Sequence, residues 1–73
     1  MRESKMEARI GSAAGVVWQY LQNQEGARTL THVRQGTKLP DQLLCMAIGW
    51  LAREGKLHFR LEGRTLRMSL KDR

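Results

Sequence analysis

The sequence offers few means of covalent or metal-based stabilisation. Its single cysteine, Cys45, cannot form an internal disulfide, and no second cysteine is present to begin a zinc motif. Paired carboxylates, glycine-rich phosphate loops and nucleophile motifs are also missing. We therefore expect a domain held together by packing alone, with no metal site, no cofactor and no enzymatic activity.

Long hydrophobic runs are absent as well. The longest weakly polar stretch, residues 10–21, is interrupted by Ser12 and Gln19 and falls short of the roughly 20 apolar residues that cross a bilayer. The first seven residues mix both charge signs and lack the features of a secretory signal. These absences predict a cytoplasmic protein that does not contact a membrane. A chain of 73 residues also leaves no second domain with which to form a cleft for a small-molecule substrate.

The composition is that of one small globular domain with a basic surface. With 41% hydrophobic and 27% charged residues, the chain can close a single core, and we expect one domain over residues 1–73 with a flexible tail at residues 1–6. Thirteen lysines and arginines against seven acidic residues give a net charge of +6. The excess of positive charge lies in the C-terminal two thirds of the chain. Such a surface attracts phosphate backbones, but it also keeps a small protein soluble.

Apolar residues at helical spacing predict a first helix over residues 7–23. Trp18 flanks its apolar stripe, and Trp50 belongs to the stripe of a later helix. We expect both indoles to anchor the core, because aromatic residues at helical spacing usually fill the interior of a small domain. The stripe of the first helix consists of Ile10, Ala14, Val17 and Leu21.

Two further helices follow from their end signals. Thr29 is suited to be the N-cap of a short helix over residues 30–35, and a very short strand at residues 27–28 could precede it. Pro40 fits the first turn of a third helix, and Gly55 fits the position just after its end. The apolar face of this third helix is formed by Leu43, Leu44, Ala47, Trp50 and Leu51.

The C-terminal part changes from helical to strand periodicity. Apolar and polar residues alternate on either side of a turn at residues 62–64, which predicts a β-hairpin. The apolar positions are Leu57, Phe59, Leu61, Leu66, Met68 and Leu70. The order of elements predicts an α+β fold, a winged helix-turn-helix with three helices followed by a C-terminal hairpin wing.

Three stretches resemble a family of small prokaryotic winged helix-turn-helix proteins of uncharacterised function. They are residues 10–18 (IGSAAGVVW), residues 46–57 (MAIGWLAREGKL) and residues 62–64 (EGR). The resemblance implies the fold and the broad class but brings no established ligand. The chain departs from the family where Pro40 occupies the usual polar N-cap position and where residues 24–28 look slightly lengthened.

The basic wing suggests that double-stranded DNA is a partner and that the protein is associated with transcription. In a winged helix the third helix normally enters the major groove, yet its outward face has few hydrogen-bond donors. We therefore expect the wing to contact phosphates, although charges on a hairpin also prevent edge-to-edge aggregation. The candidate nucleic-acid-binding residues are Gln42, Arg53, Lys56, Arg60, Arg64 and Arg67.

An alternative function is protein–protein interaction or homodimerisation without DNA binding. Gly49 lies inside the third helix, where glycine costs about 1 kcal/mol relative to alanine. Its presence is explained either by packing within the monomer or by the close approach of a partner helix, and Gly11 and Gly15 in the first helix carry the same ambiguity. The face that would receive a partner consists of Cys45, Gly49 and Ala52.

Overall fold

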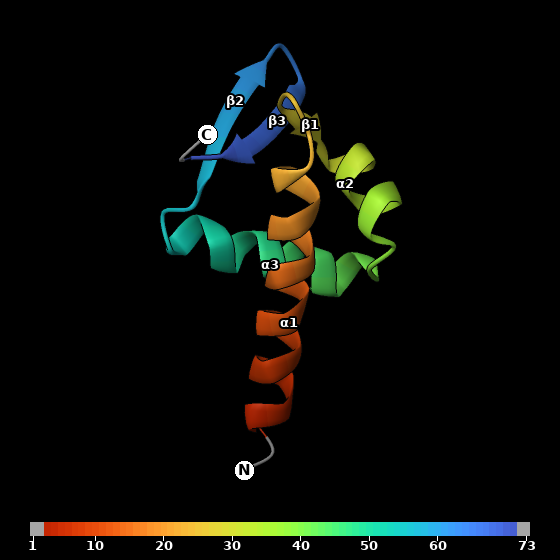
Figure 1. Ribbon diagram of the computed structural model, residues 1–73, viewed down its shortest axis with the longest axis vertical. Helices are drawn as coiled ribbons and strands as arrows, with labels where there is room; N and C mark the ends of the chain where they lie inside the picture. The colour runs from red at the N-terminus through yellow and green to blue at the C-terminus, as the bar shows by residue number, and fades with distance from the viewer. Residues whose placement is uncertain (1–2, 72–73) are drawn as a thin grey trace.

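The computed structural model describes residues 3–71, and the order of its elements is the predicted one (Figure 1). Three helices are followed by a hairpin, as predicted, and the very short strand before the second helix lies at residues 28–29, one residue later than the predicted 27–28. The elements are α1 (Glu3–Gln22), β1 (Arg28–Thr29), α2 (Leu30–Thr37), α3 (Asp41–Arg53), β2 (Leu57–Glu62) and β3 (Thr65–Leu70).

The three strands form one antiparallel sheet in the order β1-β3-β2. β3 is the central strand, so the two-residue β1 ties the start of α2 to the hairpin through the pairs Arg28–Met68 and Thr29–Arg67. Figure 1 shows α3 crossing α1, with the hairpin rising from the C-terminal end of α3. This arrangement confirms the α+β winged-helix prediction.

Helix boundaries follow local capping. Thr29 is the N-cap of α2, as predicted, and its side chain forms a reciprocal capping box with His32. The helix runs two residues past the predicted end, because Lys38 adopts a left-handed conformation (φ 59°) and its N–H bonds the Arg34 carbonyl at 2.9 Å. Gly55, also at positive φ (73°), follows the end of α3 as predicted.

The N-terminal helix is longer than the sequence pattern indicates. α1 begins at Glu3, so residues 3–6, predicted to belong to a flexible tail, are helical, whereas residues 1–2 lie outside the described residues. Residues 5–9 are exposed and lack the apolar stripe by which the helix was identified. Periodicity therefore detects only the part of α1 that packs against the core.

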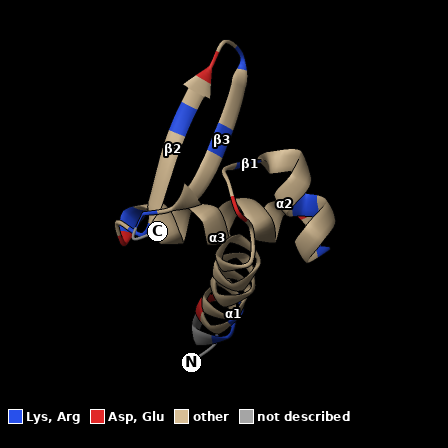
Figure 2. Ribbon diagram, turned by 45° about the horizontal axis from the view of Figure 1, so that its top comes forward, with Lys and Arg blue, Asp and Glu red and all other residues tan. Residues whose placement is uncertain are grey.

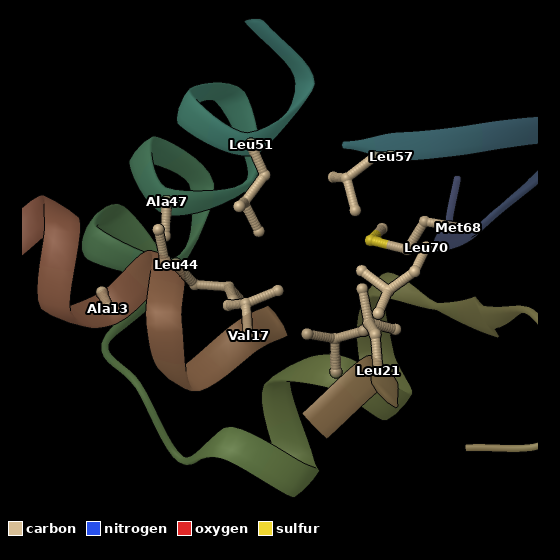
Figure 3. Packing of buried hydrophobic residues seen from close by; sticks show 11 residues of the cluster. Ala13, Val17, Leu21, Leu44, Ala47, Leu51, Leu57, Met68 and Leu70 are labelled. Atoms are coloured by element: carbon tan, nitrogen blue, oxygen red, sulfur yellow. The ribbon is translucent and has the colours of Figure 1, made fainter. Parts of the chain in front are cut away.

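The core forms where α1 and α3 cross and where the base of the hairpin closes over them (Figure 3). Small side chains occupy the crossing, since Ala13, Ala14 and Ala47 are each less than 5% exposed. Leucines, valines and one methionine fill the space between the helices and the sheet. The remaining core residues are Val17, Leu21, Val33, Leu44, Leu51, Leu57, Met68 and Leu70.

The prediction that both tryptophans anchor the core is wrong. Trp18 is 37% exposed and Trp50 is 43% exposed. The physical reason lies in the crossing itself, because an alanine-lined contact brings two helices close together and leaves no volume for an indole. Both rings therefore lie at the rim of the core, whereas Ile48, which was not assigned to the apolar face of α3, is partly buried against it.

The alternating pattern correctly places the apolar residues of the hairpin on one face but overstates their burial. Leu57, Met68 and Leu70 are buried at the base, whereas the apolar residues nearer the turn are exposed. The hairpin extends beyond the helices, so no part of the described chain covers its outer half (Figure 1). The exposed apolar residues there are Phe59 (40%), Leu61 (69%) and Leu66 (43%).

Two helical glycines differ in what surrounds them. A β-carbon at Gly36 in α2 would overlap the ring of Tyr20, so this glycine lets α2 lie against α1. A β-carbon at Gly49 in α3 would meet nothing within 4 Å. The absence of a side chain is thus required by internal packing at Gly36 but not at Gly49.

We expect Gly36→Ala to destabilise the protein and Gly49→Ala to stabilise it. Overpacking at a filled site costs about 1–3 kcal/mol, which exceeds the gain in helix propensity, whereas at the open site only the gain of up to about 1 kcal/mol applies. Urea denaturation followed by circular dichroism measures both changes in the free energy of unfolding. Equal stabilisation of the two variants would contradict the Gly36–Tyr20 contact.

Candidate nucleic-acid interface

The hairpin of β2 and β3, here called the wing, has one apolar and one polar face. Because side chains alternate along a strand, the register that places Phe59 opposite Met68 also places Arg60 opposite Arg67 on the other face. His58, Ser69, Glu62 and Thr65 share that polar face. Figure 2 shows basic positions midway along both strands and at the turn.

Glu62 connects the two arginines of the polar face. Its carboxylate accepts a hydrogen bond from Nε of Arg67 at 3.2 Å and one from Nη1 of Arg60 at 3.5 Å. Two like charges opposite each other in a sheet repel, and the shared carboxylate offsets this repulsion. All three side chains remain accessible, with exposures of 68% for Arg60, 38% for Arg67 and 50% for Glu62. The pair can therefore meet a phosphate without any change in the fold.

The base of the wing carries a second group of positive charges. Arg53 ends α3, and Lys56 leads into β2, where its carbonyl accepts a bond from the Lys71 N–H at 2.9 Å. All three residues are exposed. Arg64, also exposed, lies in the turn at the far end, next to Gly63 at φ 62°. The basic residues predicted from the sequence thus extend from the base of the wing to its tip.

The outward face of α3 is poor in hydrogen-bond donors, as expected from the sequence. Gln42 and Arg53 are exposed at its two ends. Asp41, at the N-terminus, pairs with Nε of Arg34 at 2.9 Å and would repel a phosphate there. Between the ends, the exposed side chains of α3 carry little that can read a base edge.

The predicted interaction face of α3 is exposed in the structure. Cys45, Gly49 and Ala52 all lie at the surface, and the space around Gly49 is open. Two exposed residues beside this face were not predicted to belong to it, Met46 (38% exposed) and Trp50 (43% exposed). Trp50 was assigned to the core, and Met46 was assigned no role. Helical spacing alone does not show whether an apolar residue at the edge of the stripe faces the core or the solvent.

The contact of Glu62 with the two arginines was not predicted from the sequence. It was assigned to the turn, whereas it is the last residue of β2 and faces the same side as the arginines. The alternation of side chains along the hairpin indicates that Arg60 and Glu62 share a face, because residues two apart on a strand point to the same side.

Arg28 in β1 is a second feature that the sequence did not predict. Its Nε is buried without a hydrogen-bond partner.

Within residues 3–71, no group of three or more histidine, cysteine or acidic residues comes together to hold a metal ion. The described helices include none whose length and hydropathy would suit a bilayer span.

Comparisons with known proteins agree with this architecture. A family model described as "Winged helix-turn-helix domain (DUF2582)" matches residues 1–70. The solution structure of protein BT2368 from Bacteroides thetaiotaomicron is similar, with a TM-score of 0.80 and 24% sequence identity over 90% of this chain and 79% of that one. At this identity the likeness concerns the fold alone. No curated protein matches the chain significantly.

Proposed function

We propose that this chain, which belongs to the winged helix-turn-helix family that matches residues 1–70, binds the phosphate backbone of double-stranded DNA through its wing and acts in transcription. The observation that carries the proposal is the exposed arginine pair Arg60–Arg67, set on one face of a projecting hairpin with Arg64 at its tip. Arg53, at the end of α3, and Lys56, just before β2, add exposed positive charges at the base of the wing.

The physical basis is counterion release from the duplex. Each lysine or arginine that neutralises a phosphate displaces a condensed cation, which gives an affinity that falls steeply with salt and depends little on sequence. Such contacts position a protein without reading bases. Gln42 is the one exposed side chain of α3 near its start that could contact adenine, so we expect weak sequence preference.

Reversing charges on the wing tests this proposal. We expect the double variant Arg64→Glu/Arg67→Glu to lose most of its affinity for a mixed-sequence duplex at low salt, measured by fluorescence anisotropy. The slope of log affinity against log salt should fall by about 2, since each phosphate contact contributes about 0.9. The matched control is Lys5→Glu/Arg9→Glu, which changes the net charge equally on the exposed N-terminal part of α1 and should retain binding.

Two outcomes would contradict wing binding. One is an equal loss in the control, which would mean that net charge alone governs the interaction. The other is the absence of any signal for the unaltered protein at low salt. Amide chemical shifts recorded with the duplex locate the contact, and we expect them to be confined to residues 53–71.

The carboxylate of Glu62 competes with phosphate for the two arginines, so its removal should strengthen binding. We expect Glu62→Gln to raise duplex affinity about 1.4- to fivefold, because an exposed ion pair contributes roughly 0.2–1 kcal/mol. Glu7→Gln, which makes the same charge change away from the wing, is the control. Unchanged or weaker binding by Glu62→Gln alone would show that the arginines do not contact phosphate.

A second candidate function is protein–protein interaction through α3, favoured by the exposed Met46 and Trp50 beside the open space at Gly49. We expect Gly49→Arg to abolish binding to a partner on this face while leaving the fold intact, because its side chain would fill that space. Affinity capture measures binding of the partner, and comparison of chemical shifts with those of the unaltered protein shows whether the fold is intact. Retention of every partner by Gly49→Arg would exclude this face.

A further inference from the structure

The outer edge of β2 has no strand beside it. The sheet order β1-β3-β2 gives β2 a neighbour on one side only, and the described chain places no strand along the other side (Figure 2). β2 contains no proline, and its pairing with β3 runs from Leu57–Leu70 to Glu62–Thr65 without a bulge. Prolines and bulges are two devices by which native sheets block an edge, so the edge of β2 is open to a further strand.

The pairing with β3 determines which main-chain groups face this edge. The N–H of Lys71 donates to the carbonyl of Lys56 at 2.9 Å, so these two residues form a hydrogen-bonded pair. Hydrogen-bonded and non-hydrogen-bonded pairs alternate along an antiparallel ladder, which makes Phe59 and Leu61 members of non-hydrogen-bonded pairs. Their N–H and C=O groups therefore point away from β3, toward the open edge.

The side chains along the edge are apolar on one face of the sheet and basic on the other. Phe59 and Leu61 are 40% and 69% exposed on the apolar face. Arg60 is 68% exposed on the polar face. Lys56 and His58 precede it in the same alternation and are also exposed. A strand added at this edge would therefore meet apolar surface with one set of its side chains and positive charge with the other.

We propose that the edge of β2 receives an extended segment of a partner protein in which acidic and apolar residues alternate. The main chain of this segment extends the sheet by one strand, as in other cases of strand addition. Its apolar side chains cover Phe59 and Leu61, and its carboxylates lie beside Arg60 and Lys56. The proposal goes beyond phosphate binding, because it uses the main chain and the apolar face of β2.

Charge favours an acidic partner over a second copy of the chain. The chain has a net charge of +6, and the only carboxylate of β2, that of Glu62, already accepts hydrogen bonds from Arg60 and Arg67. Pairing of two β2 strands would bring two basic wings together. Like charges opposite each other in a sheet are destabilising, whereas opposite charges contribute favourably.

Short peptides test the proposal on the full chain without DNA. The probe is a capped seven-residue peptide that alternates glutamate and valine, and the two comparison peptides alternate lysine with valine and glutamate with glycine. We expect amide chemical shifts to place the glutamate–valine peptide at residues 57–62, with slower hydrogen exchange at Phe59 and Leu61. The comparison peptides lack either the matching charge or the apolar side chains, so each should bind about fivefold more weakly or less.

Two substitutions at Leu61 separate the main chain from the side chain. Leu61→Pro removes an N–H that faces the edge without removing a bond to β3, whereas Leu61→Ala shortens the side chain and keeps the N–H. We expect Leu61→Pro to bind the glutamate–valine peptide about tenfold more weakly than Leu61→Ala, because one hydrogen bond to the added strand is lost. Heteronuclear NMR spectra establish that each variant is folded. Equal affinities of the two folded variants would overturn the proposal.

Arg60→Glu tests the charge preference. We expect this variant to lose about fivefold in affinity for the glutamate–valine peptide and to gain as much for the lysine–valine peptide. Lys5→Glu, which makes the same charge change on the exposed start of α1, is the matched control and should alter neither affinity. An unchanged preference in Arg60→Glu contradicts the proposal, as does the absence of binding by the glutamate–valine peptide at millimolar concentration.

Sedimentation of the unaltered chain tests for self-pairing. We expect a monomer of 8.4 kDa, and a concentration-dependent dimer that Leu61→Pro abolishes would assign the edge to a second copy and overturn the proposal. All these measurements are made without nucleic acid, and Leu61→Pro changes no charge. A failure here is therefore distinguishable from a failure of the wing to bind DNA.

Discussion

The close crossing of α1 and α3 is the contact on which the rest of the domain depends. Alanines at the crossing, including Ala13 and Ala47, bring the helices together and define how much room the larger core residues have. Leu44 and Leu51 reach from α3 toward the sheet, where Met68 completes the interior (Figure 3). An enlarged residue at the crossing would separate the helices and also displace the base of the wing.

The same crossing explains what could and could not be inferred from the sequence. Element order follows from periodicity and from local signals such as Thr29 and Gly55, because these act over a few residues. Burial of Trp18 and Trp50 depends instead on the distance between two helices, which small residues elsewhere determine. A single-helix pattern contains no information on that distance, so the aromatic residues were assigned to the wrong environment.

In the wing, the basic residues were predictable but their coupling was not. Alternation places Arg60 and Arg67 on one face, and their exposure follows from a hairpin that extends past the helices. The bond from each arginine to Glu62 depends on side-chain geometry at the end of β2, where the sequence showed only a turn. This carboxylate makes the polar face of the wing less positive than a count of arginines suggests, and it would compete with a phosphate for the two side chains.

The unequal distribution of glycine suggests that stability alone does not determine the surface of this protein. Gly36 is explained by the ring of Tyr20, but Gly11, Gly15 and Gly49 open onto space within helices that alanine would stabilise. Residues whose conformational preference disagrees with the element in which they lie tend to occur at functional positions. Here such residues are glycines on two helix faces, each beside an exposed tryptophan, and none of them lies on the basic wing. Phosphate contact by the wing would explain neither arrangement, and neither does packing within the described residues.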